Sequence, residues 1–229
     1  MLKGLIIKSA PRSFHEWNHF RNHKEGYEKW KNQNFLFIHV PKGAGTSINH
    51  ALGMPDLGHY TYMELCAKSC DFQEKDLIFA VHRDPLQRII STYNYACKKE
   101  KEKGYSSLSS IISTDGINGF VQKKLPSLVA NNDYFFKSTC KMLEGSPSSR
   151  TYLINFELLS DGFALIKKNL LWKAGELRKV NTSKGAFSSI SEESVQVIRE
   201  LYADDFELSK NLAGYSLRVF DEVKSGAIS

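Results

Sequence analysis

The chain has 229 residues, of which 41% are hydrophobic and 24% are charged. This length and balance favour a single α/β domain over residues 1–229 and exclude a largely disordered chain. The formal net charge of +6 suits an anionic ligand such as a nucleotide or an acidic glycan, although nucleic acid fits the sign alone equally well.

The cysteines and the hydropathy of the sequence indicate the cellular compartment in which we expect the protein. The cysteines are Cys66, Cys70, Cys97 and Cys140. They form no C-x-x-C pair and have no histidine cluster at zinc spacing, which is typical of the reducing cytoplasm. Cys66 and Cys70 are expected to pack on one helix rather than to form a disulfide. No stretch approaches the roughly 20 apolar residues of a membrane span or the core of a signal peptide, so we expect a cytoplasmic protein.

Residues 1–33 are predicted to form an N-terminal helical extension. Ser13 and Glu16 have the spacing of a capping box, an amphipathic stretch continues to Lys31, and Gly26 is a candidate helix end. Three histidines recur at every fourth residue: His15, His19 and His23. This spacing aligns their rings on one helix face, but successive turns rarely give metal geometry, so a polar face is favoured over a metal site.

Strands and helices alternate along the rest of the chain. Continuous apolar runs predict strands at Phe35–Val40, Asp76–His82 and Thr151–Phe156. Helices are predicted at residues 46–52, 85–103, 117–125, 134–143, 163–171 and 191–212. This alternation predicts an α/β fold of the three-layer α/β/α type, resembling P-loop proteins, with a central parallel sheet.

The first predicted strand runs directly into a glycine-rich turn and a helix start. These hold the residues of a phosphate cradle: Lys42, Gly43, Ala44, Gly45, Thr46 and Ser47. Small residues let backbone N–H groups approach an anion, while the helix N-terminus, the hydroxyls and the lysine add donors and positive charge. The usual nucleotide P-loop has its lysine after the glycines, whereas Lys42 precedes them.

The segment FIHVPKGAGTSI, residues 37–48, resembles the 5′-phosphosulfate loop of sulfotransferases that use 3′-phosphoadenosine 5′-phosphosulfate (PAPS). The similarity is to the carbohydrate branch that includes heparan-sulfate 2-O-sulfotransferase, which typically reads H-V-P-K-T-A-G-T-S. This chain departs at Gly43, where threonine is usual, so one hydroxyl contact is missing. Backbone N–H groups are expected to replace it.

A second motif follows the second predicted strand, in HRDPLQRIISTY at residues 82–93. Its Asp-Pro pair alone predicts only a capped helix start. The whole run is similar to the family's 3′-phosphate motif, R-D-P-x-x-R-x-x-S-x-Y, at every marked position. The resemblance implies that Arg83 and Ser91 hold the 3′-phosphate, while Arg88 is expected to support the helix. Arg83 also emerges at a strand's carboxyl end, where open α/β sheets bind ligands.

Two downstream segments are also similar to this family. Residues 177–183, LRKVNTS, resemble its L-P-x-x-N-x-S segment, with Arg178 in place of proline. This implies that Ser183 and Lys184 close over the nucleotide. Residues 201–206, LYADDF, match a late helix signature that is expected to serve packing. Residues 105–150 show little resemblance, and acceptor specificity is expected to lie in this insert.

Sulfuryl transfer requires in-line positioning, stabilisation of the leaving phosphate and a general base for the acceptor hydroxyl. Lys42 is the expected partner of the leaving oxygens, and no metal is expected. The candidate bases are His39, His50, His59, His82 and Glu64. His59 lies in GHYTYMEL, which resembles the family's H-x-[ST]-x-x-x-L element, and this similarity implies that His59 is the base. His39 is expected to support the site from within the fold.

The sequence thus predicts a PAPS-dependent sulfotransferase with Lys42 and His59 as catalytic residues. The expected acceptor is a hydroxyl compound, most readily a carbohydrate, and neither nucleic acid nor a membrane is an expected partner. Two alternatives remain open at this stage: a nucleotide-dependent kinase with the same loop, and a non-catalytic module that binds nucleotides or polyanions. The displaced lysine and the lack of a clear Mg²⁺-binding aspartate at a strand end disfavour the kinase.

Overall fold

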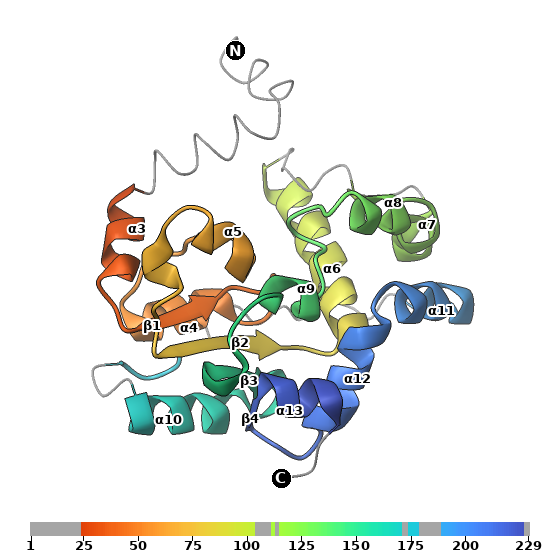
Figure 1. Ribbon diagram of the computed structural model, residues 1–229. Coiled ribbons are helices and arrows are strands. Elements are labelled where there is room, and N and C mark those ends of the chain that lie inside the picture. The colour runs from red at the N-terminus through yellow and green to blue at the C-terminus, as the bar shows by residue number, and fades with distance from the viewer. Residues whose placement is uncertain (1–23, 104–110, 113–114, 171–173, 179–188, 227–229) are drawn as a thin grey trace.

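The computed structural model describes residues 24–103, 111–112, 115–170, 174–178 and 189–226 (Figure 1). The strands are β1 Phe35–Ile38, β2 Leu77–His82, β3 Thr151–Asn155 and β4 Leu217–Val219. The helices before residue 104 are α3 Lys24–Lys31, α4 Gly45–Leu52, α5 Tyr62–Cys66 and α6 Pro85–Lys103. The later helices are α7 Gly116–Lys123, α8 Leu125–Ala130, α9 Thr139–Leu143, α10 Leu159–Leu170, α11 Glu192–Leu201, α12 Ala203–Leu212 and α13 Phe220–Ser225.

The four strands form one mixed sheet in the order β1-β2-β3-β4. β1, β2 and β3 are parallel, as the sequence predicts, and every residue of β1 and β2 is buried. The expectation of a wholly parallel sheet is wrong at its far edge, because β4 pairs antiparallel with β3. A three-residue strand is too short to give a recognisable apolar pattern in the sequence.

Two hydrophobic clusters form the interior. The larger one surrounds the sheet, with α10 and α13 packed on β3 and β4. The smaller one joins α6, α7, α8 and α11, and lies beside the sheet rather than on it (Figure 1). Part of the predicted insert, namely α7 and α8, therefore belongs to a helical cluster packed on the long helix α6.

Several predicted helices have different bounds in the structure. The predicted helix at 117–125 is two helices, α7 and α8, with a break at Lys124. The predicted helix at 134–143 begins only at Thr139, because the Ser138 hydroxyl caps α9 by accepting a hydrogen bond from the Lys141 N–H. The helix predicted at 163–171 begins earlier, at Leu159.

The predicted long helix at 191–212 is divided into α11 and α12 at Tyr202, whose φ of −126° is not helical. The Tyr202 side chain is buried, and its hydroxyl donates to the Phe136 carbonyl oxygen at 2.7 Å. Tertiary packing of one aromatic side chain therefore overrides a continuous helical pattern.

The predictions near the N-terminus and at the cysteines are also corrected. Gly26 lies inside α3 rather than ending it, and a β-carbon there would lie 3.1 Å from the Pro55 side chain. Cys66 ends α5 while Cys70 begins a short 3-10 turn, so the two do not share a helix, although both are free thiols. The residues of the predicted capping box and the histidine series lie outside the described ranges: Ser13, Glu16, His15, His19 and His23. In the ranges that are described, no helix combines the length and apolar character needed to cross a bilayer.

Candidate active site

The carboxyl ends of β1 and β2 lie side by side, because these strands are parallel and paired from Phe35–Leu77 to Ile38–Ala80. The phosphate-loop residues follow β1, and Arg83 follows β2. The two motifs, whose residues Lys42 and Arg83 are 41 positions apart in the sequence, therefore meet at one end of the sheet.

The loop has an unusual backbone conformation. Lys42 and Ala44 have φ values of 62° and 61°, in the left-handed region that side chains other than glycine seldom adopt. Ala44 is also the N-cap of α4, and no side chain caps that helix end. Alternating backbone conformations of this kind turn successive N–H groups toward one concavity, which is a general anion-binding arrangement.

Both glycines of the loop lie where a side chain would collide with the protein. A β-carbon at Gly43 would lie 2.9 Å from the carbonyl oxygen of Val81 and 3.1 Å from that of Val40. At Gly45 it would lie 1.9 Å from the His39 ring. Gly43 therefore has no room for the threonine that is usual in the family this loop resembles, and its own N–H donates to the Val40 carbonyl oxygen at 3.0 Å. The expectation that other backbone N–H groups replace that hydroxyl stays a prediction.

Lys42 lies in a partly buried position against the ring of Tyr95, with Nζ 4.3 Å from the ring centroid. Burial, together with the nearby positive charge of Arg83, lowers the pKa of Lys42 from 10.5 to about 8. Sequence reasoning identified the lysine but missed Tyr95, which lies one turn beyond Ser91 on α6.

Arg83 lies directly behind the loop. Its Nη1 donates to the Lys42 carbonyl oxygen at 3.3 Å, and its guanidinium lies 4.3 Å from the centroid of the Phe156 ring. Its Nε is buried without a hydrogen-bond partner, and burial is the main reason that the pKa of Arg83 is lowered. A buried cationic N–H without an acceptor is energetically costly, and a bound anion would remove that cost.

Neither Lys42 nor Arg83 forms an ion pair with any carboxylate in the described part of the chain. Two partly buried cations, an uncapped helix end and an inward-turned backbone therefore converge at the same sheet edge. Each of these features is stabilised by negative charge. The arrangement therefore favours an anionic ligand.

His59 lies beside this site, in contact with the ring of His39 at a centroid distance of 4.3 Å. Its Nδ1 is 3.1 Å from the His39 carbonyl oxygen, which can only accept a hydrogen bond. The proton of a neutral His59 ring is therefore on Nδ1, and the lone pair is on Nε2. This is the tautomer that a general base acting through Nε2 requires.

His39 contributes more than the supporting position that the sequence indicates. Its Nδ1 is 2.9 Å from Oδ1 of Asp56, which also accepts the Gly58 N–H, and its ring rests on Gly45. Burial alone would raise the pKa of Asp56, but the contact with His39 and the backbone donor outweigh it and hold that pKa well below its usual range. Asp56 was missed because an aspartate in a Pro-Asp-Leu-Gly turn gives only a turn signal.

The other candidate bases are engaged or remote. Both Glu64 oxygens accept from Lys137 Nζ, at 2.6 and 2.7 Å, and one also caps α5. Burial favours the neutral form of Glu64, but these hydrogen bonds outweigh it and lower its pKa. His50 is exposed near the far end of α4, four residues beyond Thr46.

His82 is buried, and each of its ring nitrogens has a hydroxyl partner. Nε2 lies 2.8 Å from the Ser209 hydroxyl, which itself donates to the Asp205 carbonyl oxygen, so Nε2 must be the donor in that contact. Nδ1 then accepts from the Thr139 hydroxyl at 3.1 Å. Burial lowers the pKa of His82, and the ring is a neutral structural group.

The remaining predicted ligands have different environments. Thr46 is exposed and Ser47 half-buried, both in the first turn of α4. Ser91 is only 5% exposed on α6, and its contact with a 3′-phosphate stays a prediction. Ser183 and Lys184 lie outside the described residues. Within the described ranges, no group of three histidine, cysteine or acidic side chains could hold a metal ion.

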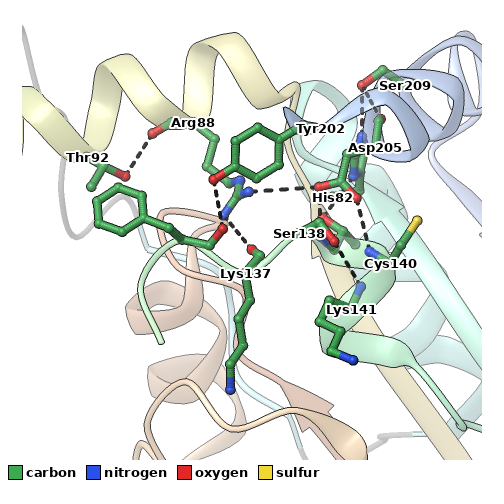
Figure 2. Close-up of polar contacts among 12 residues, drawn as sticks. His82, Arg88, Thr92, Lys137, Ser138, Cys140, Lys141, Tyr202, Asp205 and Ser209 are labelled. Carbon is green, nitrogen blue, oxygen red and sulfur yellow. Dashed lines mark hydrogen bonds and ion pairs between the residues drawn. The ribbon is translucent and has the colours of Figure 1, made fainter. Parts of the chain in front are cut away.

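Arg88, the second arginine of the motif, is a structural residue (Figure 2). It is 1% exposed, its Nη1 donates to the Lys137 carbonyl oxygen at 3.1 Å, and its Nη2 lies 3.8 Å from the buried Asp205 carboxylate. Asp205 in turn accepts the N–H groups of Thr139 and Cys140 at the start of α9. The expectation that Arg88 and the 201–206 segment serve packing is confirmed.

Compared with protein-family models, curated proteins and solved structures, the chain matches none. Its function is therefore inferred from the chemistry of the site itself.

Proposed function

We propose that this protein is a sulfotransferase that transfers a sulfuryl group from PAPS to a hydroxyl of an acceptor, most readily a carbohydrate. One observation carries the proposal: Lys42 and Arg83, from neighbouring strand ends, share one site, and neither forms an ion pair with a described carboxylate. The charges of Glu157 and Asp84 act on Arg83 from a distance. A donor with anionic groups at both its 3′ and 5′ positions matches two adjacent cationic positions.

The residues present fit such a donor. Arg83, which is half-buried next to Lys42 and has a buried Nε without a hydrogen-bond partner, would hold the 3′-phosphate together with Ser91. Lys42 and the N–H groups at the uncapped start of α4 would hold the 5′-phosphosulfate. Crowding by the Val40 and Val81 carbonyl oxygens at Gly43, and by the His39 ring at Gly45, explains why both positions are glycine.

The donor, when bound, supplies the electrophilic sulfur and a phosphate leaving group. Lys42 is positioned to stabilise the negative charge that grows on the leaving oxygen. Nε2 of His59 would accept the proton of the acceptor hydroxyl as its oxygen bonds to sulfur. His39 and Asp56 would keep the His59 ring in place beside the loop. The preference for a sulfotransferase over a kinase is supported by Asp84, whose carboxylate caps α6 by accepting the Gln87 N–H at 3.0 Å.

The test has a binding arm and a transfer arm. Calorimetric titration should show that adenosine 3′,5′-bisphosphate (PAP) binds at least about tenfold more tightly than ATP with Mg²⁺. Labelled sulfate from PAPS should then appear on members of a glycan panel. His59→Ala should bind PAP like the wild type but transfer sulfate about 100-fold more slowly. A preference for ATP would indicate a kinase, and tight PAP binding without transfer to any hydroxyl acceptor would indicate a binding module.

A further inference from the structure

Tyr134 is a large aromatic side chain that remains 43% exposed beside the proposed base. Its ring is nearly parallel to the His59 ring, with an interplanar angle of 15° and a centroid distance of 6.0 Å. Phe135 packs edge-on against both, at 5.6 Å from Tyr134 and 5.1 Å from His59. An aromatic surface therefore continues outward from the base into solvent.

The segment that carries Tyr134 is held firmly although it is not helical. The Asp133 side chain accepts the Phe135 N–H at 2.9 Å, and its carbonyl accepts the Phe136 N–H at 2.9 Å. These bonds form a compact turn that fixes the direction of the neighbouring side chains.

The buried network of Figure 2 anchors the other end of this segment. The Tyr202 hydroxyl donates to the Phe136 carbonyl oxygen, and Arg88 donates to that of Lys137. The Lys137 side chain donates to Glu64 of α5, a helix that begins three residues after His59. The donor-binding helix α6 thus fixes, through Arg88, the segment that presents Tyr134. A binding surface held this way loses little conformational entropy when a ligand arrives.

We infer that Tyr134, with Phe135 behind it, is the platform on which a sugar ring of the acceptor stacks, and that it sets the acceptor class. This inference rests on the proposed function. One face of a pyranose ring is a layer of C–H bonds, which packs against an aromatic ring, while its rim of hydroxyls stays hydrated or reaches polar groups. Because the Tyr134 and His59 ring centroids are 6.0 Å apart, a sugar on Tyr134 would be a neighbour of the proposed base.

The openness of the platform favours a sugar over a flat phenolic acceptor. Small aromatic ligands gain affinity by burying both faces in a largely apolar pocket. Tyr134 is 43% exposed and packs with its remaining surface near His59 and Phe135, so a ligand can cover only part of it, which suits a ligand with one apolar face and a polar rim. Tyr134 also belongs to the 105–150 insert, the part of the chain with little resemblance to other sulfotransferases, where acceptor specificity is expected.

The experiment uses the full chain and three probes: cellohexaose, a hyaluronan hexasaccharide and 4-nitrophenol. Saturation-transfer NMR measures contact between protein and probe without requiring turnover, and labelled-sulfate assays measure KM and kcat where transfer occurs. We expect at least one oligosaccharide to receive saturation at its C–H protons. Tyr134→Ala should abolish that signal and raise the acceptor KM about tenfold with little change in kcat. Tyr134→Phe, which keeps the ring, should behave like the wild type.

Tyr215→Ala is the matched control, because Tyr215 is 47% exposed and contacts Arg218 near β4 instead. PAP titrations on every variant distinguish this inference from the proposed function. If the wild-type protein does not bind PAP, the proposed function is wrong. The NMR contacts, in turn, test the role of Tyr134 as the sugar-binding platform. The inference is overturned if neither oligosaccharide contacts the wild type, if Tyr134→Ala retains the contact, or if only 4-nitrophenol binds.

Discussion

Arg83 lies just before α6 and Arg88 lies in its first turn, five residues later. The two arginines nevertheless have different charged neighbours. Arg88 is fully buried and has a carboxylate, a carbonyl oxygen and the Tyr202 ring around its guanidinium, although its Nε and Nη2 make no hydrogen bond. Arg83 is partly buried beside a second cation, and no described carboxylate pairs with it.

The contrast distinguishes residues that stabilise the fold from residues that we propose bind a ligand. A buried arginine with its acid partner holds segments together, and removing one partner leaves the other charge unpaired. Two unpaired cations at one site lower the stability of the ligand-free protein, so their presence is explained by an anion that binds there. Substitutions on the two sides should therefore affect different measurements.

The largest effect is expected at the reacting end of the anion site. Lys42→Ala should lower kcat about 10³-fold or more, because it removes the charge opposite the leaving oxygen. Its midpoint of thermal unfolding should stay level or rise, since the repulsion from Arg83 disappears. Rate assays and thermal melts of Lys42→Ala, run in parallel, check these two expectations. A variant that unfolds at a clearly lower temperature but keeps the wild-type rate would contradict the distinction between the two sets of residues.

On the structural side, Arg88→Met should reduce the free energy of unfolding by about 3 kcal/mol, because Asp205 would remain buried without its cation. Urea unfolding followed by circular dichroism measures this. Lys210→Ala removes an exposed pair with Glu207 and serves as the control, with a loss below about 0.5 kcal/mol. An Arg88 variant as stable as the control would show that the network is not structural.

Arg83→Ala sharpens the comparison because it tests the contact with the 3′-phosphate separately from the contact with the 5′-phosphate. PAP affinity should fall about 100-fold, corresponding to about 2.7 kcal/mol, while the affinity for AMP, which lacks the 3′-phosphate, should change little. Thermal stability should be nearly unchanged. Equal losses for PAP and AMP would mean that Arg83 does not select the 3′-phosphate.

The smallest expected effect is a pH dependence. With the pKa of Lys42 near 8, PAP affinity should fall about tenfold between pH 7 and pH 9 as the ammonium loses its proton, and Lys42→Met should lose this dependence. The same group makes the ligand-free protein more stable as the pH rises from about 8 to 10.5, because the unfolded chain then binds more protons. Calorimetry and urea melts across this range test both signs.

The sequence was sufficient for features set by local chemistry. Buried strands appear as apolar runs, Asp84 acts as the expected cap, and the lysine and glycines of the loop lie between a strand and a helix start as predicted. Features set by distant contacts were not predictable. The helix break at Tyr202 depends on Phe136, the role of Asp56 depends on His39, and Tyr95 matters only because α6 passes under Lys42. None of these pairs is adjacent in sequence.

The most direct test of the central claim is a crystal structure with PAP bound. Our account predicts one nucleotide with its 5′-phosphate on Lys42 and the N–H groups at the start of α4, and its 3′-phosphate on the Arg83 guanidinium. A nucleotide that leaves either cation untouched, or that binds away from the ends of β1 and β2, would contradict the account.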